Sequence, residues 1–162
     1  MPTAVCFASW GMSSLRLLSS SAEQTIGQGR SLASLMKTPL LVMLSGELGA
    51  GKTTLAKGII SGLGAGREED VTSPSFTLVH LFHNSCKVYH IDLYRVADFH
   101  DLETLGLEDV FTEPAVVLVE WPERLTLRTD WPTVRVNLVH LPDGSRQIDI
   151  EDEQSALAST GV

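Results

Sequence analysis

The chain has 162 residues, the length of one domain, and a single core of that size buries roughly two-thirds of the unfolded surface. Hydrophobic residues make up 43% and charged residues 20%, which excludes wholesale disorder. Lys and Arg number 12 against 20 Asp and Glu, so the formal charge of −8 argues against a protein that binds nucleic acid on its own. Two cysteines exclude a disulfide framework, and no apolar run approaches the roughly 18 residues of a membrane span.

The first 20 residues, MPTAVCFASWGMSSLRLLSS, contain no acidic residue, one Arg and several Ser. This composition faintly resembles an organellar transit peptide, and the alternative is a poorly ordered leader with Met12 as the true start. We expect the leader, which leaves one domain over residues 21–151 and a frayed tail over 152–162. If residues 1–20 are such a leader, we expect the protein in the cytoplasm; organellar targeting by residues 1–20 is the alternative.

The first half of the domain predicts a helix, a strand and a second helix. Ser21 and Gln24 form a capping-box pattern, and apolar residues recur at helical spacing from there to Met36. The continuous apolar run 40–45 predicts a buried parallel strand. An apolar stripe that begins at Lys52 and ends in glycines predicts a helix that stops near Leu63. The polar segment 67–74 predicts a loop.

Short strands and turns dominate the second half. Segments 76–82 and 87–92 predict an antiparallel pair, 98–111 predicts two short helical turns interrupted by Gly106, and 115–120 predicts another buried strand. Segments 134–141 and 147–151 flank Pro142, Asp143 and Gly144, which predicts a hairpin. Together these elements predict an α/β fold with a mostly parallel sheet, flanking helices and a C-terminal antiparallel hairpin.

Residues 46–53 read GELGAGKT and match G-x-x-x-x-G-K-[ST], the Walker A phosphate cradle, between a predicted strand and a predicted helix. The glycines let backbone N–H groups face phosphates, and the helix start adds its positive dipole end. Lys52 is then placed to reach the β and γ phosphates of ATP, and the Thr53 hydroxyl to bind Mg²⁺. The residues expected to bind ATP here are Gly46, Glu47, Leu48, Gly49, Ala50, Gly51, Lys52, Thr53 and Thr54.

Two predicted strands end in a carboxylate, Asp92 in KVYHID and Glu120 in AVVLVE. Ligands in open α/β sheets bind at such strand ends. We predict that Glu120 is a Mg²⁺ ligand, directly or through water, and that Asp92 is a second acid that orients the metal or the attacking water. A solvated strand end or a helix cap is the alternative for these acids. The predicted catalytic residues are therefore Lys52, Asp92 and Glu120, and the predicted metal ligands are Thr53, Asp92 and Glu120.

Other polar residues give weaker signals. Thr72 and Ser73 lie in the loop where nucleotide-sensing switch segments occur, so a hydroxyl here, assigned to Thr72, is expected to follow the γ-phosphate; turn chemistry before Pro74 is the alternative. Arg95 and Arg124 follow the two acid-ended strands, and we expect them either to pair with those acids or to face phosphate. The five histidines show no metal-ligand spacing, and we interpret them as structural.

The order of five motifs is more specific than any one of them: SGELGAGKTTLAKGI, TSPSFTLV, YHIDLYR, ETLGLEDVF and VEWPER. In this order, over residues 21–150, the chain resembles the TsaE (YjeE-type) family. The resemblance implies a compact ATPase, weak in isolation, that serves a threonylcarbamoyl transferase complex of TsaD- and TsaB-type subunits. That complex modifies the adenosine beside the tRNA anticodon, so tRNA is contacted indirectly. The resemblance also implies Mg²⁺ ligation by Thr53 and Glu120, acid catalysis by Asp92 and a function for Trp121.

The sequence departs from the family pattern in two places. Its leader is longer, and the segment near Ser21 and Thr25, which resembles the family's adenine-proximal region, matches only loosely. Two alternative functions use the same P-loop. One is a small-molecule kinase, although no Arg-rich segment suggests a lid; the other is a docking module gated by ATP, with incidental hydrolysis.

Overall fold

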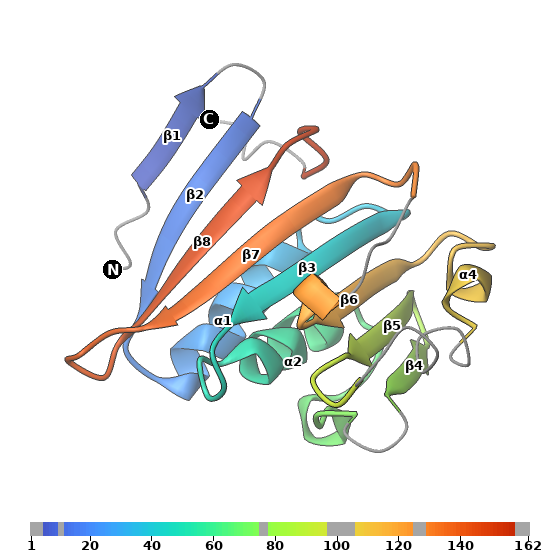
Figure 1. The fold of residues 1–162 in the computed structure, drawn as a ribbon, viewed down its shortest axis with the longest axis horizontal. Helices are drawn as coiled ribbons and strands as arrows, with labels where there is room; N and C mark the ends of the chain where they lie inside the picture. The colour runs from blue at the N-terminus through green and yellow to red at the C-terminus, as the bar shows by residue number, and fades with distance from the viewer. Residues whose placement is uncertain (1–4, 10–11, 75–77, 97–105, 125–128, 158–162) are drawn as a thin grey trace.

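The computed structural model describes residues 5–9, 12–74, 78–96, 106–124 and 129–157. They form one eight-stranded sheet with strand order β1-β2-β8-β7-β3-β6-β5-β4 (Figure 1). The strands are β1 (Val5–Ser9), β2 (Met12–Ser19), β3 (Leu40–Gly46), β4 (Val79–His83), β5 (Lys87–Asp92), β6 (Val116–Glu120), β7 (Thr133–His140) and β8 (Arg146–Asp152). The helices are α1 (Ala22–Ala33), α2 (Lys52–Gly62) and the short α4 (Leu107–Val110), with 3-10 turns at Glu68–Asp70 and Pro122–Arg124.

The four central strands β7, β3, β6 and β5 run parallel to one another. Antiparallel strands extend both sides: β8, β2 and β1 beyond β7, and β4 beyond β5. The predicted α/β fold with a mostly parallel core and a C-terminal hairpin is confirmed. Because parallel strands point their carboxyl ends to one edge, the ends of β3, β5 and β6 meet there.

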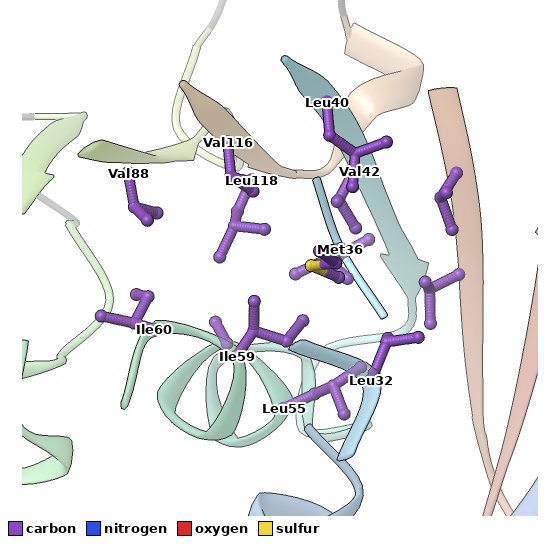
Figure 2. Close-up of a cluster of buried hydrophobic side chains, with 14 of the residues drawn as sticks. Leu32, Met36, Leu40, Val42, Leu55, Ile59, Ile60, Val88, Val116 and Leu118 are labelled. Carbon is purple, nitrogen blue, oxygen red and sulfur yellow. The ribbon is translucent and has the colours of Figure 1, made fainter. Parts of the chain in front are cut away.

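Helices α1 and α2 cover one face of the sheet (Figure 1). Figure 2 shows Leu55, Ile59 and Ile60 of α2 facing Val42 of β3 and Leu118 of β6, all of them buried. Alternate residues on the same strands point to a second cluster on the other face, which α4 covers; it includes Leu41, Val117, Val119, Leu107 and Val110. Burial on both faces explains why these strands read as continuous apolar runs.

Most predicted elements are confirmed in place. Ser21 caps α1, since the backbone N–H of Gln24 donates to the Ser21 Oγ at 3.0 Å. The Gln24 side chain accepts from the backbone N–H of Ser20 at 2.8 Å, one residue before the position that a capping box requires. Of the two helical turns predicted over 98–111, the structure describes α4, and the rest lies outside the described residues. No helix in the described part of the chain is long and apolar enough to span a membrane.

The structure differs from the expected disordered leader over Met12–Ser19, which form β2. Strand β2 pairs with β8 along its length, from the pair of Ser13 with Asp152 to the pair of Ser19 with Arg146. Its Leu15 and Leu17 pack against the core beneath α1 and α2. Leu15 and Leu17 alternate with the charged Arg16, which is a strand pattern. The serines around it made the segment resemble a disordered leader. At the other end, β8 continues to Asp152, inside the segment expected to fray.

Candidate nucleotide-binding site

The P-loop, residues 46–53, joins the end of β3 to the start of α2, as predicted. Gly46 has φ +148°, and a Cβ there would lie 2.5 Å from the carbonyl oxygen of Leu138 on β7. Gly51 is the N-cap of α2 and has φ +106°. Residues with a side chain rarely adopt either backbone conformation, so the path of the loop requires glycine at both positions. The turn aims the first backbone N–H groups of α2 at the adjoining space, an arrangement suited to phosphate.

A cleft of about 430 Å³ opens beside this turn. Its lining includes, from the P-loop and α2, Leu48, Gly49, Gly51, Lys52, Thr53 and Thr54, and from other elements Ser73, Asp92, Tyr94, Arg95, Glu120, Trp121 and Arg146. We call this space the nucleotide cleft. It gathers most of the predicted site residues at the carboxyl edge of the parallel strands.

Lys52 lies almost fully buried at the floor of the cleft, with 4% of its surface exposed. Its Nζ donates to the carbonyl oxygens of Gly46 at 2.6 Å and Glu47 at 2.9 Å. The same Nζ lies 4.3 Å from the centre of the Trp121 ring, within the range of a cation–π interaction. The ammonium is thus held inside the loop that would wrap the phosphates.

Charges around Lys52 oppose the effect of its burial. Desolvation lowers the pKa of the Lys52 ammonium, whereas the carboxylates of Glu120, Asp92 and Glu123 act to raise it. An incoming polyphosphate would add negative charge beside the ammonium and favour its charged form further. The site therefore suits an anionic ligand.

Glu120, at the end of β6, is 2% exposed and faces α2. The Thr53 Oγ1 lies 3.0 Å from its Oε1 and 3.1 Å from its Oε2, so the hydroxyl donates to the carboxylate. A metal bound at the Thr53 oxygen would use a lone pair and leave this donated proton in place. The predicted metal ligands Thr53 and Glu120 are thus adjacent.

Asp92, at the end of β5, pairs in register with Glu120 of the neighbouring parallel strand. Its Oδ2 accepts a hydrogen bond from the Ser73 Oγ at 2.6 Å, and its Oδ1 accepts one from the backbone N–H of Tyr94 at 2.9 Å. Asp92 is 8% exposed and lines the cleft. Both carboxylate oxygens are therefore held by a hydrogen bond.

The donor set fits a magnesium ion brought in with a nucleotide. The described residues contain no group of three His, Cys, Asp or Glu side chains that would hold a metal by themselves. Mg²⁺ bound to nucleotides needs less, because one or two carboxylates, phosphate oxygens and water complete its octahedral shell. Thr53, Glu120 and Asp92 offer hard oxygen atoms of that kind beside the phosphate cradle.

Other predicted residues lie in varied places. Thr72 and Ser73 are both exposed; Ser73 lines the cleft, and Thr72 is not among its lining residues. Arg124 donates from Nη1 to the carbonyl oxygen of Val96 at 3.0 Å and lies 5.9 Å from the Tyr94 ring centre, so it braces the segment after β5. Arg95 lines the cleft and is exposed.

Trp121 directly follows Glu120 and has φ +62°, a strained conformation for a bulky residue. Its ring packs on the Tyr94 ring, with centres 4.9 Å apart, and on the Lys52 ammonium. The ring therefore forms a wall of the cleft beside the reactive end of the P-loop. This location accords with the function that the family resemblance implies for Trp121.

Two site residues were not recognised from the sequence. The buried His90 lies 2.6 Å from Glu120, from its Nε2 to the carboxylate Oε2. Arg146, at the start of β8, lies against Gly51 and donates to the Thr25 Oγ1 at 3.3 Å. The signal for His90 was its position two residues before Asp92, which puts both on one face of the strand. Arg146 carried no such signal, because its place depends on how β8 pairs.

The chain is similar to known proteins over most of its length. The family model described as threonylcarbamoyl adenosine biosynthesis protein TsaE matches residues 19–148. The tRNA threonylcarbamoyladenosine biosynthesis protein TsaE of Treponema pallidum is 36% identical over 136 residues, which cover 84% of this chain and 99% of that protein. Its counterpart in Bacillus subtilis is 33% identical over 138 residues, 85% of each. The crystal structure of Bacillus subtilis YdiB matches with a TM-score of 0.65 and 27% identity, covering 89% of this chain and 88% of that one. This chain belongs to the TsaE family.

Proposed function

We propose that this chain is a Mg²⁺-dependent ATPase that supports formation of N6-threonylcarbamoyladenosine beside the tRNA anticodon. The observation that carries the proposal is the meeting of Lys52, Thr53, Asp92 and Glu120 in one cleft at the end of the P-loop. A phosphate cradle alone would support nucleotide binding only. The buried carboxylate of Glu120, which contacts the Thr53 hydroxyl, and that of Asp92 in the same cleft add the groups that hydrolysis needs.

Each residue has a distinct task in this mechanism. The P-loop N–H groups and Lys52 bind the phosphates, and Lys52 stabilises the charge that develops on the transferred phosphoryl group. Thr53 and Glu120 would hold Mg²⁺, which neutralises phosphate charge and acts as a Lewis acid. Asp92 would orient the attacking water, since Ser73 and the Tyr94 N–H hold its carboxylate in one position.

The names of the relatives support the role in tRNA modification, and the charge of the chain supports an indirect one. With a formal charge of −8 the chain has no general attraction for tRNA. We therefore place tRNA on the partners, which we propose are the TsaD- and TsaB-type subunits of a threonylcarbamoyl transferase. ATP turnover would then regulate or reset that complex.

Lys52→Ala and Glu120→Gln test the ATPase assignment. We expect Lys52→Ala to weaken Mg²⁺-ATP binding about 10- to 100-fold, because it removes a charge-assisted contact to phosphate. Glu120→Gln is expected to keep nucleotide binding in the presence of a chelator, to lose most of the affinity gained from Mg²⁺, and to lose most phosphate release, measured with and without partner subunits. Lys57→Ala is the matched control, since Lys57 lies on the same helix and is not among the residues that line the cleft. Unchanged turnover in Lys52→Ala would contradict the assignment.

A pull-down with nucleotide present tests the partners. The full chain is used as bait with Mg²⁺ and a slowly hydrolysed ATP analogue, and bound proteins are identified by mass spectrometry. We expect threonylcarbamoyl transferase subunits to bind the unaltered chain and to bind Lys52→Ala less. If these subunits bind neither protein, the proposed partners are wrong, whatever the ATPase assay gives.

A further inference from the structure

His90 is a fully buried imidazole that the mechanism above does not use. It has 0% exposed surface and lies on β5, two residues before Asp92. Its Nε2 is 2.6 Å from the Oε2 of Glu120. An imidazole in a sheet core usually needs a polar partner, and here that partner is the carboxylate assigned to the metal.

The contact is built by two central strands rather than by loops. In the parallel pair β5 and β6, His90 lies opposite Leu118, and Glu120 follows two residues later on the same face. Both strands are buried on that face under α2, so neither side chain has room to move away (Figure 1). The geometry is therefore fixed before any ligand enters.

The groups around the His90 ring determine which of its two nitrogens carries the proton. An ionised carboxylate only accepts hydrogen bonds, so the Nε2 of His90 must donate to Glu120. The His90 Nδ1 is buried and has no hydrogen-bond partner among the described residues. A proton on Nδ1 would be a buried unpaired donor, which is costly. The tautomer with its proton on Nε2 satisfies the contact and leaves no buried donor without a partner.

The His90 Nε2 is a second hydrogen-bond donor to the Glu120 carboxylate, and the two donors together constrain it more than Thr53 does alone. Thr53 contacts both oxygens of Glu120 from one hydroxyl, whose proton can follow either oxygen as the group turns. The terminal torsion of a Glu side chain is broad, so one shared donor leaves that rotation open. A donor fixed at Oε2 by the strand selects one orientation of the Glu120 carboxylate, which lines the cleft.

We propose that His90 is a positioning residue that holds the Glu120 carboxylate in the orientation needed to bind Mg²⁺ with a nucleotide. This inference rests on the proposed function of the cleft. Outer groups that hydrogen-bond to metal ligands commonly contribute 10- to 100-fold to metal affinity or activity. The histidine in the YHIDLYR motif thus acts through Glu120 and does not touch the nucleotide.

Two amide variants separate positioning from packing. In His90→Gln the amide nitrogen extends about as far as Nε2 and can donate to Glu120, whereas in His90→Asn it is too short. The readout is the nucleotide dissociation constant with Mg²⁺ and with a chelator, measured by titration of a fluorescent ATP analogue. We expect His90→Asn to lose about 10-fold or more of the affinity gained from Mg²⁺, with chelator-state binding unchanged. His90→Gln should stay within about 3-fold of the unaltered chain.

Further variants keep the outcome decisive if the amide changes disturb folding. His90→Leu replaces the imidazole with an apolar side chain that cannot donate to Glu120, and it should behave like His90→Asn. His83→Gln is the matched control, because His83 is exposed at the opposite end of the β4–β5 hairpin. Equal effects of Gln and Asn at position 90 would overturn the proposal. Loss of nucleotide binding in the presence of chelator in all three variants would also overturn it, because His90 would then only support the fold. The affinity readout requires no turnover, so absence of ATP hydrolysis would sink the ATPase assignment separately.

Discussion

At the scale of residues, the site is unusual because charged side chains lie where the rest of the core is apolar. Lys52 and Glu120 expose 4% and 2% of their surface. Burying a charge costs stability unless hydrogen bonds replace water, and here two carbonyl oxygens serve Lys52 while a hydroxyl and an imidazole serve Glu120. These partners prearrange the charges, so little reorganisation is needed when phosphates enter.

Ser73 offers a sharp test of the role of Asp92. Ser73→Ala removes the donor that lies 2.6 Å from the Asp92 Oδ2 and should let the carboxylate turn toward solvent. Loss of a hydrogen bond to a charged group corresponds to about 10-fold in turnover. We expect that decrease in phosphate release at saturating ATP, with nucleotide affinity within about 3-fold of the unaltered chain.

Ser85→Ala is the control for Ser73→Ala, because Ser85 is exposed in the turn between β4 and β5. If Ser73→Ala leaves turnover intact, the position of Asp92 does not depend on this hydroxyl. If it weakens nucleotide binding as strongly as turnover, Ser73 contacts the nucleotide rather than acting through Asp92.

At the scale of elements, the contact between α1 and α2 sets where the P-loop lies. The two helices approach so closely that a Cβ on Gly58 would lie 2.1 Å from the carbonyl oxygen of Ile26. A Cβ on Gly29 of α1 would lie 2.6 Å from the carbonyl oxygen of Leu55. Since α2 begins at Lys52, the packing of α1 against it supports the first turn that faces the phosphates.

Gly58→Ala should push the two helices apart. We expect it to lower the free energy of unfolding by about 1–3 kcal/mol, the usual cost of overpacking, even though Ala favours a helix. Gly27→Ala is the matched control on α1, because nothing lies within 4 Å of a Cβ built there. That variant should gain about 0.5–1 kcal/mol. Urea unfolding curves measure both values, and equal effects of the two substitutions would show that the helix contact is looser than described.

Local sequence patterns predicted the strand and the helix on either side of the P-loop. The features that the sequence did not predict depend on pairing between segments that are distant in the sequence. The apolar run at 40–45 and the helix from Lys52 needed no knowledge of neighbours. Strand β2 depends on β8, which lies about 130 residues away, as the pair of Arg16 with Asp149 illustrates. The contact of His90 with Glu120 likewise depends on the register of β5 and β6. A sequence shows that two acids end two strands, and the sheet decides which histidine lies beside one of them.

At the scale of the whole molecule, the strand order explains why chemistry gathers at one edge. Strand β3 lies between β7 and β6, so the P-loop at its end has Glu120 at the end of β6 on one side and the end of β7 on the other. The hairpin returns the chain to bring Arg146 against Gly51. Residues as far apart in the sequence as Leu48 and Arg146 therefore meet around one cleft, and a ligand in it would link them.

Ligand binding to this junction should stabilise the entire fold. A ligand present at 100 times its dissociation constant adds about 2.7 kcal/mol to the free energy of unfolding. For a chain of this size that corresponds to a rise of about 5–11 °C in Tm. We expect such a rise with Mg²⁺ and a slowly hydrolysed ATP analogue, and a smaller one when Mg²⁺ is chelated. In Lys52→Ala we expect about half the rise or less, because 10- to 100-fold weaker binding leaves about 0.4–1.4 kcal/mol at the same ligand concentration. Differential scanning calorimetry measures all three. An equal rise in Lys52→Ala would mean that the stabilising ligand binds elsewhere, because the buried ammonium would then make no difference to its affinity.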